Sequence, residues 1–363
     1  MKIKFENFVF DDNVINEIER KCFMVGAHDF NRYLHESKFG GKPVISVLHD
    51  LKDQKEFVDK IPNEKDLHLS IEQQKTIVID FYKSLNAELG KRVEDILNNN
   101  DPRYSVNITQ DLSKDCGGGV STKDGSNLIH IDINLDSGVH GLRVLAHEMS
   151  HALSGFKTKA YDVINKGSQN DINDFFHNLG NFSVDSIGEI ESHIVEFLFM
   201  DYLTNQKLIS KDDYLNFEDR RNNSTLNNIK TIIEESYIFD NIQPPITPDK
   251  FEKFEKQIGG IIKTKKYKTL MNRAIFMYKR DEHSGYSQYD FRYVIGEVVS
   301  ANWFEKYTIS TPQQKQEMVD EFIKYLEHTH TMNLESSCAD LLGLTPGETF
   351  ASYISYIQAK TVS

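Results

Sequence analysis

The sequence predicts a mainly α-helical protein with one small β-hairpin. Apolar residues recur at spacings of three and four along most of the 363 residues, which is the period of an α-helix. One stretch breaks this pattern: Cys116–Leu135 holds a glycine triplet followed by strict alternation of apolar and polar residues.

Two helices carry clear start signals. Ser70–Leu97 has apolar residues near helical spacing and opens with Ser-x-x-Gln, which resembles a capping box. Thr311–His330 opens with Thr-Pro, a capping residue followed by a proline in the first turn. Asn241–Lys250 holds three prolines and is predicted to connect helices.

The hairpin is predicted from its turn and its alternation. Asp124-Gly125 is a turn signal, and Ile129, Ile131 and Ile133 would share one buried face. We expect the strand Leu128–Ile133 to offer its backbone to an extended peptide.

Composition narrows the class of protein. The chain carries 55 acidic and 42 basic residues, a formal net charge of −13, and no basic stripe, so a nucleic-acid partner is not expected. Three widely separated cysteines form no disulfide framework and favour a reducing compartment. The N-terminus has no apolar signal region and no run is long enough to span a membrane, so we expect a cytoplasmic protein without membrane contact. Export by a signal-less route is the alternative.

The chemistry-bearing motif is "LAHEMSHAL", Leu145–Leu153. Apolar spacing predicts a helix from Gly141 to Ser154, which Gly155 would end. On that helix His147 and His151 lie one turn apart and could share a metal ion, with Glu148 beside them to take a proton from water. The alternative is a helix with ordinary polar residues.

A metal ion held by two histidines needs a third protein ligand. Asp185–Leu203 is an apolar helix with a polar stripe formed by Glu189, Ser192, His193 and Glu196. Ionisable groups on such a helix need partners, and a cation would supply one. Glu189 is the predicted ligand, with His193 as the alternative. Glu196 is expected to orient a histidine ligand.

A second stripe lies near the C-terminus. Tyr286, Tyr289 and Tyr293 fall on one helical face. Such a stripe is usually part of a core, but buried phenol hydroxyls could also donate hydrogen bonds to a developing oxyanion.

Taken together, these parts resemble the M3 family of zinc oligopeptidases, which includes thimet oligopeptidase and oligoendopeptidase F. The resemblance rests on "GGGV", "NLIHIDIN", "RVLAHEMSHALS", "EIESHIVE" and the tyrosine-rich segment from Glu282 to Tyr307, and it covers Cys116 to the end. It implies a helical zincin (gluzincin-type) catalytic domain with a small sheet beside the HExxH helix. It also implies one Zn²⁺ on His147, His151 and Glu189, with Glu148 as general base.

The resemblance further implies that Tyr286 and Tyr293 donate hydrogen bonds to the substrate carbonyl and the intermediate, with His283 as a further candidate. It predicts a catalytic region over residues 116–363 and an N-terminal helical region over 1–115 that packs on it. The chain departs from the family in three ways: it is shorter, it lacks a glycine before the second histidine, and 37 residues separate His151 from Glu189. The polar stretch between them would form a lid or specificity loop.

The sequence therefore predicts a zinc metalloendopeptidase whose partner is a peptide or protein substrate. Two alternatives remain: a host-directed protease effector of narrow specificity, and a catalytically inactive scaffold that binds a peptide or protein. No feature of the sequence sets an oligomeric state.

Overall fold

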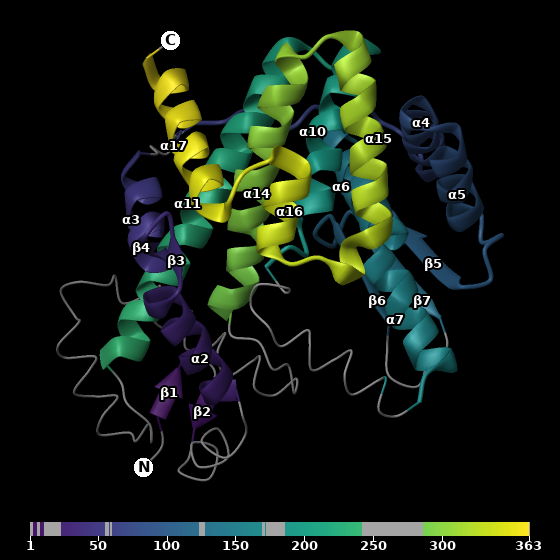
Figure 1. Ribbon diagram of the computed structural model, residues 1–363. Coiled ribbons are helices and arrows are strands. Elements are labelled where there is room, and N and C mark those ends of the chain that lie inside the picture. The colour runs from purple at the N-terminus through teal and green to yellow at the C-terminus, as the bar shows by residue number, and fades with distance from the viewer. Residues whose placement is uncertain are drawn as a thin grey trace. The chain divides into compact units, whose positions relative to one another are not determined.

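The computed structural model describes residues 3–5, 8–10, 23–54, 58, 60–122, 128–168, 171, 186–241 and 286–362 (Figure 1). The strands are β1 (Ile3–Phe5), β2 (Phe8–Phe10), β3 (Lys38–Phe39), β4 (Lys42–Pro43), β5 (Tyr104–Thr109), β6 (Gly117–Thr122) and β7 (Ile129–Asn134). The helices are α2 (Phe23–Glu36), α3 (Val44–Gln54), α4 (Ile71–Leu85), α5 (Ala87–Leu97), α6 (Val139–Leu153), α7 (Gly155–Lys166), α10 (Ile190–Asn205), α11 (Lys211–Asn241), α14 (Tyr286–Ile309), α15 (Pro312–His328), α16 (Leu334–Leu342) and α17 (Pro346–Val362), with a 3-10 turn η1 (Thr329–Thr331). The mainly helical class with small sheets is confirmed.

The chain forms two compact units. The first holds residues 1–56, 224–294 and 361–363, and the second holds residues 57–223 and 295–360. In the first unit the Phe30 ring packs edge-on against the Phe291 ring, with their centroids 5.6 Å apart. All the residues of the candidate site described below belong to the second unit. The predicted division between residues 115 and 116 stays a prediction.

The predicted capping signals form as expected, but one helix is split. Ser70 accepts a hydrogen bond from the Gln73 N–H in a capping box, and Thr311 and Gln314 make the same arrangement at α15. The stretch predicted as one helix, Ser70–Leu97, breaks at Asn86 into α4 and α5. Asn86 causes the break because its side chain caps the N–H groups of Glu88 and Leu89.

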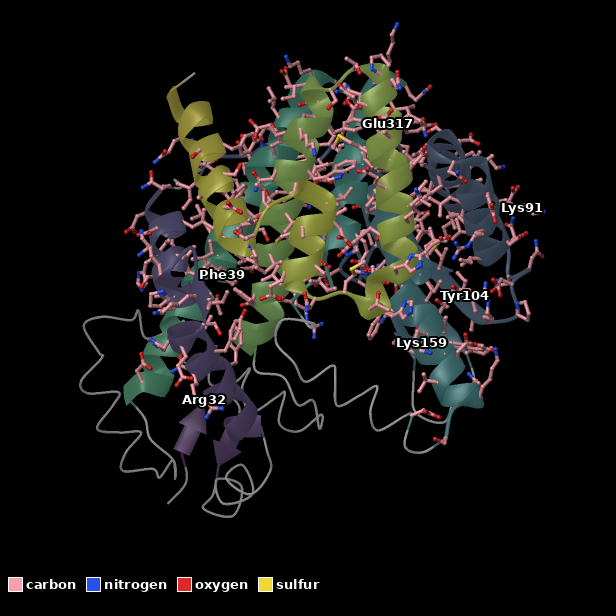
Figure 2. The ribbon with its side chains drawn as sticks, in the orientation of Figure 1. Arg32, Phe39, Lys91, Tyr104, Lys159 and Glu317 are labelled. Atoms are coloured by element: carbon pink, nitrogen blue, oxygen red, sulfur yellow. The ribbon has the colours of Figure 1, made fainter. Side chains whose placement is uncertain are left out.

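The hairpin belongs to a three-stranded sheet with the order β5-β7-β6. β6 and β7 are antiparallel as predicted, and Ile129, Ile131 and Ile133 are buried on one face. β5 pairs parallel with β7 from the other side, and Tyr104 at its start is labelled in Figure 2. The expectation that Leu128–Ile133 offers its backbone to a peptide is wrong, because β7 is paired along both edges.

The helix that carries the two histidines, α6, lies against the sheet and against α4 and α10. Two buried tyrosines of earlier elements hold its backbone: Tyr82 donates to the Ala146 carbonyl at 2.8 Å, and Tyr104 donates to the Ala152 carbonyl at 2.7 Å. These bonds are among the contacts between the predicted N-terminal region and α6, together with the bond from the Val139 N–H to the Lys65 carbonyl.

The end of α6 differs from the prediction. Ser154 ends α6 and also caps α7, where its hydroxyl accepts from the Phe156 N–H at 3.3 Å. Gly155 therefore begins the next helix instead of closing the last one. The polar stretch predicted to form a lid or specificity loop therefore starts as a helix, since α7 continues to Lys166.

Several predicted features lie outside the described residues. These are the Asp124-Gly125 turn, most of the polar stretch before Glu189, and the Asn241–Lys250 connector apart from Asn241, which ends α11. Of the helices within the described ranges, none is long and apolar enough to cross a membrane.

Candidate metal centre

The two histidines of α6 face one another across a turn of the helix. Apolar neighbours at helical spacing, including Leu145 and Met149, are fully buried and fix the helix in place. As a result, Nε2 of His147 and Nε2 of His151 lie 3.1 Å apart. The predicted helix therefore brings both ring nitrogens to one point.

Glu189 joins this point from a second helix. It is the N-cap residue of α10, which packs against α6. Its Oε2 lies 3.4 Å from Nε2 of His147 and 3.4 Å from Nε2 of His151. Ser192 donates to the same Oε2 at 3.1 Å and so fixes the orientation of the carboxylate. The structure thus brings together the three residues predicted as metal ligands.

The donor atoms fit a zinc ion. Zinc bonds of about 2.0 to 2.2 Å in a tetrahedral site place neighbouring donors roughly 3.3 to 3.6 Å apart. The three separations here are 3.1, 3.4 and 3.4 Å. Two imidazoles and one carboxylate are also the ligand set of open, catalytic zinc sites. Among the described residues, His147, His151 and Glu189 form one of two groups that could hold a metal ion.

Each histidine is oriented from its other ring nitrogen by a carboxylate. Oε1 of Glu196 lies 2.7 Å from Nδ1 of His147, and Oε1 of Glu191 lies 3.4 Å from Nδ1 of His151. A carboxylate at Nδ1 favours the proton on that nitrogen and leaves Nε2 to bind a metal. The expectation that Glu196 orients a histidine is confirmed.

Glu196 is held in turn by two arginines, of which Arg221 is buried and Arg143 is half-buried. Its Oε2 accepts from Arg143 at 2.7 Å and from Arg221 at 2.9 Å, and Arg221 also pairs with Glu297. Burial alone would raise the pKa of the Glu196 carboxyl, but the two arginines outweigh burial and hold this pKa well below its usual range. Glu196 is therefore ionised beside His147.

The same carboxylates act on the histidines. Burial alone would lower the pKa of His147, but hydrogen bonds to Glu189 and Glu196 outweigh burial and raise it to about 9. In His151, too, burial is outweighed by Glu189 and Glu191, and its pKa rises well above the usual value. The anionic surroundings thus attract positive charge to this point, from protons or from a metal ion.

Glu148 is poised next to this cluster. Its side chain is only 6% exposed, and within the described part of the chain its Oε2 has no hydrogen-bond partner. It packs against Gly118 of β6, where an added Cβ would lie 3.1 Å from Cγ of Glu148. A buried carboxylate oxygen without a partner is costly unless water or a ligand occupies the space beside it.

His193, the alternative ligand, does not join the cluster. Its ring centroid is 6.2 Å from that of His147, and it lies against Gly296 of α14, where a Cβ would come within 2.7 Å of its Nδ1. Burial, with Arg221 nearby, lowers the pKa of His193 to about 3, so this ring is neutral. Gly296 also lets α14 approach the backbone carbonyl of Glu189.

The predicted oxyanion donors cannot be placed at the cluster. Tyr286 begins α14, but its side chain is outside the described set, and His283 lies outside the described residues altogether. Tyr293 is a half-buried residue of α14 in the first unit. Their roles stay predictions.

Sequence reasoning missed four residues of the centre: Glu191, Arg143, Arg221 and Glu297. Glu191 could have been found, because it lies on the helix already singled out. Arg143 stands one turn before His147 on α6, which is a weak signal by itself. Arg221 and Glu297 reach the site from distant parts of the chain, and no local pattern marks them.

Comparison with known proteins agrees at the level of the fold. No family model matches the sequence, and no curated protein matches it. Among solved structures, a protein assigned as an oligoendopeptidase F from Bacillus anthracis str. Ames is similar, with a TM-score of 0.53 and 13% identity over 98% of this chain. PZ peptidase A, solved with an inhibitor, gives a TM-score of 0.53 at 10% identity over 98% of this chain.

A second protein assigned as an oligoendopeptidase F gives a TM-score of 0.53 at 12% identity. The chain matches 57%, 59% and 60% of the length of these three neighbours. The protein therefore shares its fold with these three neighbours while spanning less than two thirds of their length.

Proposed function

We propose that the protein is a zinc-dependent endopeptidase. The observation that carries the proposal is the triangle of His147 Nε2, His151 Nε2 and Glu189 Oε2, whose sides are 3.1, 3.4 and 3.4 Å. A bound zinc ion would supply Lewis acidity to a water molecule and to the scissile carbonyl. The similarity of the fold to solved peptidase structures also supports the proposal of a peptidase.

Glu148 is the proposed general base. It directly follows His147 on α6, and its buried Oε2 has no partner among the described residues. It would take a proton from the attacking water and deliver it to the leaving amine. Tyr286, Tyr293 and His283 remain the proposed donors to the oxyanion, and loss of one such donor typically lowers kcat by about 100-fold or more.

The proposed substrate is an extended peptide along β6. In the described sheet β6 is an outer strand, and its Gly118 touches Glu148. A Cβ at Gly117 or Gly119 would meet nothing within 4 Å, so a substrate backbone can come close. Pairing through main-chain hydrogen bonds recognises an extended peptide with little dependence on its sequence.

The test compares the native protein with Glu148→Gln on a diverse peptide mixture, read by mass spectrometry, with zinc content measured in both. We expect cleavage by the native protein alone and the same zinc content in the two proteins. Cleavage by Glu148→Gln at the native rate would overturn the assignment of the base. Zinc binding without cleavage of any peptide by the native protein would contradict a general endopeptidase and leave a binding scaffold or a protease for one protein target.

A further inference from the structure

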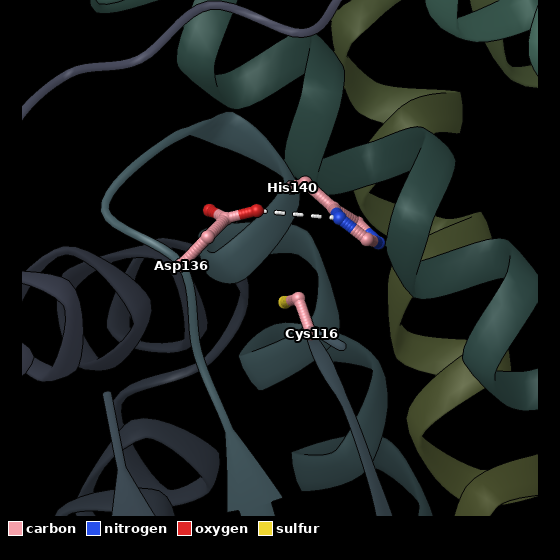
Figure 3. Close-up of side chains that lie close together, drawn as sticks. All are labelled: Cys116, Asp136 and His140. Atoms are coloured by element: carbon pink, nitrogen blue, oxygen red, sulfur yellow. Dashed lines mark ion pairs between the residues drawn. The ribbon is translucent and has the colours of Figure 1, made fainter. Parts of the chain in front are cut away.

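We propose that Cys116, Asp136 and His140 form a second binding site for a divalent transition-metal ion such as Zn²⁺. Their donor atoms all lie within 4.8 Å of one another, and this is the other group among the described residues that could hold a metal ion. Figure 3 shows the carboxylate of Asp136 and the ring of His140 pointing toward each other, with Cys116 beside them. The site goes beyond the proposed peptidase centre, with which it shares no residue.

The fold brings these residues together from three segments. Gly117 of β6 pairs with Asn134 of β7, so Cys116, one residue before β6, lies opposite the end of β7, where Asp136 follows. His140 is in the first turn of α6, four residues after Asp136. The hairpin register and the start of α6 therefore fix the cluster.

The position of Asp136 is set by the backbone. Its Oδ1 accepts from the N–H groups of Gly138 and Gly141, both at 2.8 Å. Its Oδ2 then lies 3.3 Å from Nδ1 of His140. An added Cβ at Gly141 would come within 2.9 Å of Oδ1, so glycine is needed for this arrangement. Capping of α6 thus uses one carboxylate oxygen and turns the other toward His140.

Helix capping and the ion pair account for the positions of the Asp136 and His140 side chains. Neither interaction needs the thiol of Cys116 beside them. Cys116 is a free, half-buried cysteine at this point. Asp136 and then Cys116 raise the pKa of His140 to about 9, against the opposing effect of burial. Thiolate, imidazole and carboxylate together are ligands that suit zinc and related metals, whereas magnesium and calcium prefer oxygen alone.

The second site is expected to bind more weakly than the first. Side chains are 39% exposed at His140 and 35% at Asp136, against 15% at His147 and 9% at Glu189. Solvent access leaves room for water to complete the coordination. A bound ion would tie the start of β6 to the first turn of α6.

Co²⁺ is the probe, because a thiolate bound to Co²⁺ gives a strong near-ultraviolet charge-transfer band that imidazole and carboxylate ligands do not give. The full-length chain is titrated with Co²⁺ under reducing conditions, alongside Cys116→Ser and His140→Ala. Cys338→Ala and Cys22→Ala are the matched controls. Circular dichroism checks that each variant is folded.

We expect the native chain to bind two Co²⁺ ions and to show the thiolate band. Cys116→Ser and His140→Ala should each bind one Co²⁺ and lose the band, while both controls keep it. A band that persists in Cys116→Ser, or no band in the native chain in excess Co²⁺, would overturn the proposal. Failure of the peptidase centre is distinguishable, since it would remove the Co²⁺ that Cys116→Ser retains.

Discussion

The carboxylate of Glu196 lies 2.7 Å from Nδ1 of His147 and joins that histidine to a pair of arginines, Arg143 and Arg221. Its other oxygen accepts from Arg143 and Arg221, whose side chains are 18% and 8% exposed. One carboxylate therefore orients a proposed zinc ligand and compensates two positive charges, one buried and one half-buried. We therefore expect both the metal affinity of the site and the stability of the fold to depend on Glu196.

Replacing Glu196 with Gln should weaken both properties. Loss of a carboxylate that orients a histidine ligand typically lowers metal affinity by about 10- to 100-fold. Removing one partner of a buried ion pair costs about 3 to 5 kcal/mol of stability, because it leaves a buried charge uncompensated. Chelator competition and urea unfolding measure the two effects. Glu317→Gln on α15 is the control, since Glu317 is exposed (Figure 2) and should leave both unchanged.

Replacing Glu191 with Gln should have a smaller effect. Glu191 contacts Nδ1 of His151 at 3.4 Å, a longer distance than that of Glu196 to His147. We expect a loss of zinc affinity of about tenfold, the lower end of the range for such residues. The same chelator competition checks it. A larger loss of zinc affinity than in Glu196→Gln would contradict the expectation that Glu196 contributes more to zinc binding than Glu191.

Gly118→Ala should slow turnover and spare metal binding. A Cβ at position 118 would lie 2.9 Å from Cγ1 of Ile133 and 3.1 Å from Cγ of Glu148, so it would push against the proposed base. Gly119→Ala, where a Cβ meets nothing within 4 Å, separates this contact from obstruction of the substrate along β6, because it should raise KM without lowering kcat. We expect kcat to fall in the first variant alone, with zinc content unchanged in both. Equal rates in the two variants would mean that the contact with Glu148 has no catalytic consequence.

Tyr82→Phe should lower stability without changing the metal centre. The variant loses a buried hydrogen bond to the Ala146 carbonyl, which typically costs about 1 kcal/mol. Urea unfolding measures the cost, and chelator competition should give the native zinc affinity. A marked loss of zinc affinity would show that Tyr82 also sets the position of His147.

Metal removal should inactivate the protein reversibly. In the Cys116→Ser background, which lacks the proposed second site, treatment with a chelator should abolish peptide cleavage and lower the midpoint of thermal unfolding. A ligand that binds only the folded state stabilises it, so the midpoint falls when the ligand is removed. One equivalent of Zn²⁺ should restore both. Cleavage that survives complete removal of metal would contradict zinc-dependent hydrolysis.

Local patterns in the sequence predicted the parts of the fold that depend on neighbours along the chain. The helical spacing around His147, the capping boxes at Ser70 and Thr311, and the alternation at Ile129, Ile131 and Ile133 all correspond to observed elements. The i, i+4 spacing of the histidines was enough to place their nitrogens together, because a helix fixes that geometry.

Contacts between distant segments were not predictable in this way. β5 is a short strand whose parallel pairing with β7 depends on residues more than twenty positions away. Arg221 and Glu297 meet across 76 positions, and nothing near either one signals the other. Gly155 was predicted to end α6, because glycine commonly ends a helix. In the structure Ser154 ends α6 and caps α7, so Gly155 is the first residue of α7.

The most direct test is anomalous diffraction from a zinc-loaded crystal, recorded on both sides of the zinc absorption edge. We expect an anomalous peak bounded by Nε2 of His147, Nε2 of His151 and Oε2 of Glu189, with metal–ligand distances of about 2.0 to 2.2 Å. A zinc-loaded crystal with no peak between these three atoms would contradict the proposed metal centre.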